Sequence, residues 1–289
     1  MIVYNRMNFG GIQVKLIDIL DQLVSQHISV MLVLRRAEGE FIKEIPPRVR
    51  VVNLQLGKNP INAIFMVWDL IFLIAKFQPT SILTFADHVS SLVIVAKTIL
   101  VKRHIPIFIC EGIHLSTYLR FQPMGKIRWA MVKIFYPLAT NVIVLTEAQK
   151  KDLIDNFCIP DSKIIINPNW VSKRFTRHLR GAKPTKIIDI LFVGRLEPQK
   201  NLLIFLEIVK ELTLSGVRLS VIFVGDGLQR EELERWSKKH HINSIVTFVG
   251  FSDNPVRYFR RSKIFLLTSL YEGQPHAVIE AMRTGIPVV

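Results

Sequence analysis

Short apolar segments alternate with longer amphipathic segments along the chain, and this alternation restricts the fold more than any other feature. Apolar segments lie at 1–4, 28–34, 81–85, 105–110 and 187–193, and segments such as 12–25, between the first two, repeat apolar residues at helical spacing. Strands that alternate with helices form parallel sheets covered by helices on both faces. The sequence therefore predicts an α/β protein.

Two such series are separated by a polar, basic segment without periodicity. This segment spans 170–186 and contains Gly181 and Pro184, which are typical of connections between domains. A chain of 289 residues is long enough for two ordinary domains. We therefore predict Rossmann-like domains at 1–169 and 187–289, joined by a linker at 170–186.

The net charge of +15 indicates an anionic partner, either a phosphorylated substrate or an anionic lipid surface. Nucleic acid is not expected, because no zinc-finger spacing, RNA-binding signature or arginine-rich arm is present. The most apolar segment, 61–77, contains Asp69 and Lys76 and is shorter than the roughly 20 residues that a membrane span needs. We expect a helix packed between the sheet and its neighbours there, and a cytoplasmic location because no signal peptide is recognisable.

Three predicted strands end in turns that suit phosphate binding or acid–base chemistry. Gly10-Gly11 follows the first strand and opens a helix, either as a phosphate-facing loop or as a plain tight turn. Glu111 and His114 follow the strand 105–110, where ligands bind to open α/β sheets. Arg195 and Lys200 follow the strand 187–193, either as a clamp for two phosphate groups or as an ordinary surface pair.

The last stretch, 262–289, combines a strand, a polar turn, a helix and a second apolar strand. Glu272 lies in the turn, Gly273 and Gln274 precede the helix that begins near Pro275, and Glu280 lies within that helix. The free N–H groups of such a helix start can bind anionic or hydroxyl oxygens. Two ordinary surface glutamates are the alternative interpretation.

The stretch E-G-Q-P-H-A-V-I-E-A-M resembles the E-x7-E motif of retaining glycosyltransferases with the GT-B fold, in particular glycosyltransferase family 4. The turn G-R-L-E-P-Q-K is similar to the G-R-x-x-x-x-K motif of the same family. The resemblance extends over essentially the whole chain. It implies two Rossmann-like domains that face each other across a cleft, with the acceptor on the first domain and the nucleotide-sugar on the second. Because the family continues beyond the strand at 286–289, we expect the second domain to be incomplete at its C-terminus.

The resemblance also implies roles for individual residues. Arg195 and Lys200 would neutralise the leaving diphosphate, and Glu272 would lie by the donor sugar. Glu280 would bond the ribose hydroxyls of the nucleotide. The loop Gly10-Gly11 would face the donor diphosphate, and Gly273 and Gln274 would complete the donor site. His114 is expected at the donor sugar or reacting centre, with Glu111 as the alternative because the spacing Glu-x-x-His departs from the adjacent pair of the family.

The function implied is that of a retaining glycosyltransferase of the hexosyltransferase type. It would move a sugar from a nucleotide-diphosphate donor, with a UDP-sugar expected, to a glycan or lipid-linked acceptor in bacterial surface polysaccharide, lipopolysaccharide or glycolipid assembly. No cofactor and no metal ion are expected, because the clamp lacks a nearby Asp-x-Asp sequence and its cations can replace a metal. A GT-B epimerase of nucleotide-sugars and a truncated, non-catalytic remnant that binds sugar nucleotides are the alternatives.

One basic segment with aromatic residues suggests an additional partner. From Met124 to Tyr136 it has helical spacing and contains Lys126, Arg128 and Lys133. Such a helix can lie on an anionic membrane surface as a peripheral contact, or it can pack its apolar side on the sheet.

Overall fold

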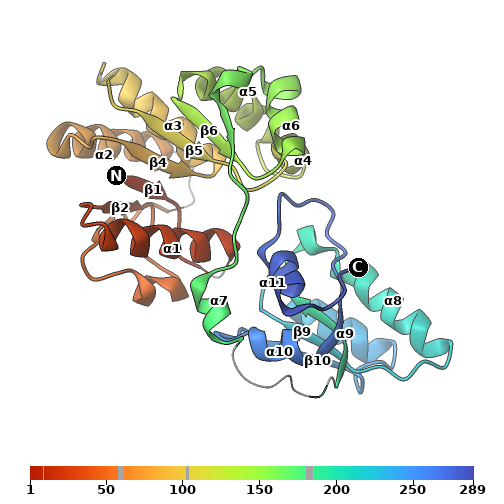
Figure 1. Ribbon diagram of the computed structural model, residues 1–289. Coiled ribbons are helices and arrows are strands. Elements are labelled where there is room, and N and C mark those ends of the chain that lie inside the picture. Colours follow the sequence, from red (N-terminus) through yellow and green to blue (C-terminus); the bar gives the residue numbers. More distant parts are fainter. Residues whose placement is uncertain (9, 58–61, 102–103, 180–184, 186) are drawn as a thin grey trace. The chain divides into compact units, whose positions relative to one another are not determined.

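The computed structural model describes residues 1–8, 10–57, 62–101, 104–179, 185 and 187–289 (Figure 1). These residues divide into two compact units, Met1–Asn169 and Trp170–Val289. Each unit contains one parallel sheet with helices packed on it, as the alternation of apolar and amphipathic segments predicts.

The first unit contains a seven-stranded parallel sheet in the order β3-β2-β1-β4-β5-β6-β7. Its strands are β1 (Ile2–Tyr4), β2 (Met31–Leu34), β3 (Arg50–Asn53), β4 (Ile82–Phe85), β5 (Ile107–Cys110), β6 (Asn141–Val144) and β7 (Ile164–Ile166). Because the strand order reverses at β1, the carboxyl ends of β1 and β4 flank the point where open α/β sheets bind ligands.

Helices cover both faces of this sheet. They are α1 (Gly11–Ser25), α2 (Asn62–Phe77), α3 (Asp87–Ile99), α4 (Leu115–Arg120), α5 (Gly125–Phe135) and α6 (Glu147–Phe157), with short 3-10 turns η1 (Glu40–Glu44), η2 (Tyr136–Leu138) and η3 (Asp161–Lys163). In Figure 1, α1 lies on one face and α2 and α3 lie on the other. Alternate strand residues fill the two cores: Val3 packs with residues of α2 and α3, whereas Ile2 and Tyr4 pack with residues of α1.

The second unit contains a four-stranded parallel sheet in the order β10-β9-β8-β11. Its elements are α7 (Lys173–Arg177), β8 (Ile188–Val193), η4 (Pro198–Lys200), α8 (Leu202–Leu214), β9 (Val221–Val224), α9 (Arg230–Lys239), β10 (Val246–Gly250), α10 (Val256–Arg261), β11 (Ser262–Phe265) and α11 (His276–Thr284). Phe192, Phe205 and Phe223 form an aromatic core with ring centroids 4.6 to 6.2 Å apart. The strand expected at 286–289 forms only a single parallel bridge, between Val288 and Phe265 of β11.

The expected linker contributes to the second unit. Within 170–186, residues Lys173–Arg177 form α7, and Phe175 is buried against Phe259 with ring centroids 5.7 Å apart. Residues 180–184 and 186 of that segment lie outside the described part of the chain.

Helix α2 has two apolar faces. Met66, Leu70 and Ile74 are buried in the core of the unit, which agrees with the packed helix expected there. On the opposite face Trp68 and Phe72 are 63% and 60% exposed, so the expectation of a fully covered helix is wrong. None of the helices in the described ranges has the length and apolar character to cross a bilayer.

Two loops of the second unit approach each other so closely that only glycine fits between them. Gly225, after β9, has φ +139°, and a Cβ atom there would collide with the carbonyl oxygen of Gly194, after β8. The two loops are also joined by backbone hydrogen bonds, including Leu196 N–H to Asp226 O at 2.9 Å. The position of the loop at 194–200 therefore depends on Gly225.

We expect Gly225→Ala to destabilise the second unit more than Gly216→Ala. Gly216 also has positive φ (+84°), but a Cβ atom added there would meet no other atom within 4 Å, so its substitution costs only the backbone strain of about 1–2 kcal/mol. Gly225→Ala adds displacement of the Gly194 backbone to that strain. Urea unfolding of both variants measures the difference, and equal losses of unfolding free energy would contradict this account.

Candidate functional site

The second unit brings together two loops that the sequence analysis singled out. Strands β8 and β11 are hydrogen-bonded neighbours and run parallel, so their carboxyl ends lie side by side. The loop after β8 contains Lys200, and the loop after β11 contains Glu272. Leu270 N–H donates to Gln199 O at 2.9 Å and the Thr268 hydroxyl donates to Lys200 O at 2.9 Å, which fixes one loop on the other.

Lys200 and Glu272 form an ion pair at this point. Lys200 Nζ lies 2.5 Å from Glu272 Oε1, and the two side chains are only 14% and 20% exposed. Gln199 Nε2 donates to Tyr271 O at 2.9 Å and lies 3.5 Å from Glu272 Oε2. Arg195, the other half of the expected clamp, is exposed. The structure thus holds the Lys200 ammonium group at the strand ends and leaves Arg195 at the surface.

Helix α11 presents a carboxyl group that is an unusually weak acid. Gly273 and Gln274 lead into Pro275, the N-cap of α11, and Glu280 lies in the second turn. Burial raises the pKa of Glu280 to about 8, so its carboxyl group is largely protonated at pH 7. A protonated carboxyl group can both donate to and accept from the hydroxyl groups of a ligand.

In the first unit, the first turn of α1 lies against the loop after β5. Gly10 is the N-cap of α1 and Gly11 is its first residue. A Cβ atom at Gly112 would lie 3.6 Å from the side chain of Ile12, in the first turn of α1. The glycine turn and the segment with His114 are therefore neighbours at the carboxyl edge of the sheet.

His114 is held by a buried carboxylate. It is the N-cap of α4, and its Nδ1 atom lies 3.5 Å from Asp152 Oδ2 and 3.0 Å from Thr117 Oγ1. Asp152 accepts hydrogen bonds from Ser116 N–H (3.0 Å) and Asn156 Nδ2 (2.9 Å). A carboxylate only accepts, so it favours the proton on Nδ1 and leaves Nε2 available to a ligand. Asp152 lies on α6, and no local sequence pattern links it to α4, so sequence alone does not predict this contact.

Glu111 lies beneath the loop rather than at its surface. It is 3% exposed, and the Tyr136 hydroxyl donates to its Oε1 atom. Burial, together with the negative charge of Asp87, raises the pKa of Glu111 to about 8. His114, with its side chain 34% exposed, is the member of the Glu-x-x-His sequence that a ligand can reach.

One cation of the basic helix α5, Arg128, is paired inside the first unit. Arg128 donates two hydrogen bonds to Asp87, Nε to Oδ2 at 2.8 Å and a second to Oδ1 at 2.5 Å. Burial opposes ionisation of Asp87, but hydrogen bonds from His88 and Arg128 outweigh it and lower its pKa to about 2. Of the three cations of this segment, Arg128 is therefore paired within the protein instead of being available to a lipid surface. Trp129 also packs inward, with its ring centroid 4.5 Å from that of Phe157.

Among the described residues, no three His, Cys, Asp or Glu side chains are grouped so that they could hold a metal ion. The cysteines in these ranges, Cys110 and Cys158, are free thiols. Metal independence stays a prediction.

We expect Glu111→Gln to reduce the pH dependence of stability. The folded pKa of about 8 lies above the ordinary value of 4.5, so the folded state binds more protons than the unfolded state between these values. Stability therefore falls as pH rises from about 4.5 to about 8, by up to about 1.4 kcal/mol per pH unit. Gln keeps the acceptor for Tyr136 but cannot ionise. Denaturant unfolding at pH 5 and pH 7.5 tests this, with the exposed Glu40→Gln as control; an unchanged slope would refute it.

Comparison with known proteins extends these observations. Residues 9–174 match the profile of Glycosyltransferase Family 4, and residues 174–289 match that of Glycosyl transferases group 1. An uncharacterised glycosyltransferase of Methanocaldococcus jannaschii is 26% identical over 87% of this chain and 65% of its own length. A UDP-Gal:alpha-D-GlcNAc-diphosphoundecaprenol alpha-1,3-galactosyltransferase of Escherichia coli is 27% identical over 57% of this chain and 46% of its own. The matches thus span less than two thirds of these relatives.

Solved structures share the fold. The Anabaena protein HepE, in complex with UDP and glucose, superposes with a TM-score of 0.73 at 17% identity, covering 100% of this chain and 80% of its own. The two Rossmann-like domains of the GT-B type, expected from the sequence, are confirmed. The family profile alone covers more than half of the chain. The chain belongs to glycosyltransferase family 4.

Proposed function

We propose that this protein transfers a sugar from a nucleotide-diphosphate donor to a glycan or lipid-linked acceptor, with retained configuration. The observation that supports this most directly is the Lys200–Glu272 pair at the adjacent ends of β8 and β11. The pair fixes a cation where phosphate would bind, and its carboxylate keeps that cation in place before the donor arrives.

In the proposed reaction the acceptor hydroxyl oxygen forms the new bond to the anomeric carbon while the bond from this carbon to the diphosphate oxygen breaks. The proton of the acceptor hydroxyl passes to the departing diphosphate. Negative charge then grows on the departing diphosphate. Lys200 and the exposed Arg195 stabilise that charge, which is electrostatic catalysis of the oxyanion kind. The protonated carboxyl group of Glu280 suits hydrogen bonding to the ribose hydroxyls, and Gly273 and Gln274 would complete this donor site.

The first unit would supply the acceptor side. The imidazole of His114, oriented by Asp152, presents Nε2 to the reacting sugar, and the Gly10-Gly11 turn offers backbone N–H groups to the donor diphosphate. Glu111 would support this loop from below as a neutral acid.

The comparisons favour a UDP-sugar and a lipid-linked acceptor. The Escherichia coli relative is named for galactose transfer from UDP-Gal to a sugar on diphosphoundecaprenol, and the HepE structure contains UDP. We therefore propose a metal-independent hexosyltransferase of bacterial surface polysaccharide or glycolipid assembly.

The donor site is tested by UDP binding and by transfer from a panel of UDP-, GDP- and ADP-sugars, with products identified by mass spectrometry. We expect Lys200→Gln to weaken UDP binding about 10- to 100-fold, because a charge-assisted contact to phosphate contributes about 1.5–3 kcal/mol. Glu272→Gln removes the carboxylate that keeps Lys200 in place, so it should impair transfer. The exposed Lys238→Gln on α9 is the matched control. Unchanged UDP affinity in Lys200→Gln, or no transfer from any donor, would contradict the proposal.

We also propose peripheral contact of α5 with an anionic membrane surface at the cytoplasmic face. Lys126 and Lys133 lie on its exposed face together with Ile127 and Ile134, which are 54% and 62% exposed. Cations beside exposed apolar side chains suit the boundary between headgroups and acyl chains.

We expect the double variant Lys126→Gln, Lys133→Gln to bind phosphatidylglycerol vesicles about 10- to 30-fold more weakly, since each cation contributes about 1 kcal/mol near an anionic surface. Vesicle sedimentation measures this. The control is Lys151→Gln with Lys238→Gln, which removes the same charge elsewhere. Equal binding of the two double variants would show that overall charge, rather than α5, determines vesicle binding.

A further inference from the structure

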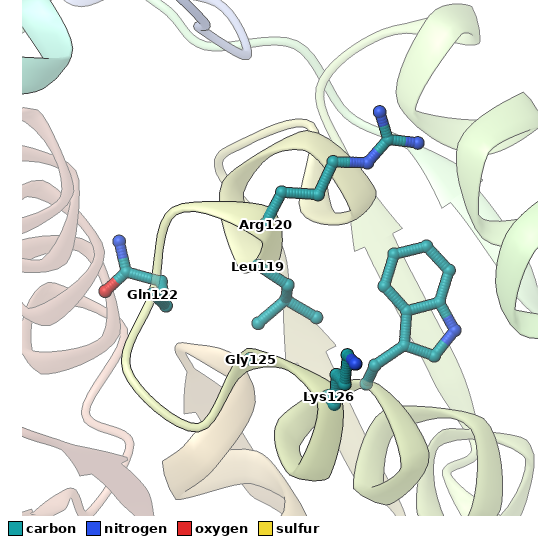
Figure 2. A pocket seen from close by; sticks show the side chains of 6 residues that line it. Leu119, Arg120, Gln122, Gly125 and Lys126 are labelled. Carbon is teal, nitrogen blue, oxygen red and sulfur yellow. The ribbon is translucent and has the colours of Figure 1, made fainter.

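A hollow of about 470 Å³ lies between α4 and α5 in the first unit. Leu119 and Arg120 at the end of α4, Gln122 in the connecting turn, and Gly125, Lys126 and Trp129 of α5 line it. Figure 2 shows the long side chain of Arg120 extending from α4, with Gln122 in the turn and Lys126 on the facing helix.

The backbone around this hollow is closely fitted. Met124, just before α5, has the left-handed conformation (φ 56°), which turns the chain sharply between the two helices. A Cβ atom at Gly125 would collide with the carbonyl oxygen of Leu119, so α5 begins directly against the end of α4. Leu119 is 2% exposed, and Trp129 is anchored on Phe157. The hollow is therefore a built feature of the helix pair.

The charged side chains that line the hollow are positive. Arg120 and Lys126 are both exposed, and no carboxylate is among the described residues that line it. A planar guanidinium fork beside a flexible ammonium group suits phosphate oxygens, and the Gln122 amide adds further donors. The chemistry therefore favours a phosphate or diphosphate group.

Exposed apolar side chains adjoin these cations in the sequence. Phe121 is 60% exposed, Met124 56% and Ile127 54%, and each lies within a few residues of Arg120 or Lys126. A free phosphate would leave these side chains in water. A phosphate joined to an apolar chain would bind both groups.

We propose that this hollow binds the diphosphate of a lipid-linked sugar acceptor. Helix α4 connects the hollow with His114: it has six residues, and its axis rises about 9 Å from His114 to Arg120. This length suits an acceptor in which one sugar separates the reacting hydroxyl from the phosphates. That the bound lipid diphosphate carries an acceptor sugar rests on the proposed transferase function. That the hollow binds a diphosphate joined to an apolar chain does not depend on it.

The test is binding of farnesyl diphosphate to the full chain by calorimetry, compared with inorganic diphosphate, farnesol and phosphatidylglycerol vesicles. Arg120→Gln is the key variant, because Lys126 also belongs to the face proposed for the membrane. We expect Arg120→Gln to weaken farnesyl diphosphate binding at least roughly tenfold and to leave UDP binding unchanged. Lys151→Gln, an exposed cation on α6, is the matched control and should bind as the parent does.

Farnesyl diphosphate should bind at least about tenfold more tightly than either inorganic diphosphate or farnesol. Equal binding of inorganic diphosphate would indicate a site for free phosphate, and equal binding of farnesol would indicate a purely apolar site. If Arg120→Gln weakened vesicle binding as much as farnesyl diphosphate binding, the site would be one for lipid headgroups. Each of these results would overturn the proposal, and so would an Arg120→Gln variant that binds farnesyl diphosphate as the parent does. Failure of transfer from every donor, with farnesyl diphosphate binding intact, would overturn the proposed function and leave this site standing.

Discussion

Parallel strand pairing is the constraint on which the rest of this protein depends. Because all strands of a parallel sheet end at the same edge, residues distant in sequence meet there without any local signal. The ion pair of Lys200 and Glu272 is the clearest result, since the two residues follow neighbouring strands β8 and β11. The ion pair is partly buried and holds a positive charge at this edge of the sheet.

The first unit shows how the environment gives carboxyl groups different protonation states within one sheet edge. Asp87 is kept ionised by His88 and Arg128, and this negative charge in turn helps to keep Glu111 protonated. Asp152 accepts hydrogen bonds and orients His114. Asp87 thus serves as the counter-ion of Arg128, Glu111 as a buried neutral group and Asp152 as the group that orients His114, although the three acids have similar intrinsic strength.

The sequence was sufficient for the fold class and for the division into two α/β series, because period-2 and period-3.6 patterns are local properties. It did not predict α7 within the expected linker, and the strand expected at 286–289 is reduced to one bridge. The motifs that contain Lys200 and Glu272 are contiguous, so the sequence singled out both residues, but it did not show that they pair. It could not show that Arg128 turns inward, since the Asp87 that pairs with it lies on another helix, α3. Asp152 was missed for the same reason. The sequence left Glu111 and His114 as alternatives, and only burial separated them.

The glycine contact between the loops after β8 and β9 has a consequence for engineering. A side chain at Gly225 would collide with the backbone at Gly194, so neither loop can change its conformation independently of the other, although they are separate in sequence. Grafting only the 194–200 loop from a relative with another sugar preference would break that fit. A chimera should therefore exchange both strand–loop segments together. The loop after β11 meets the 194–200 loop through hydrogen bonds and an ion pair instead of a glycine contact, so it tolerates small shifts better.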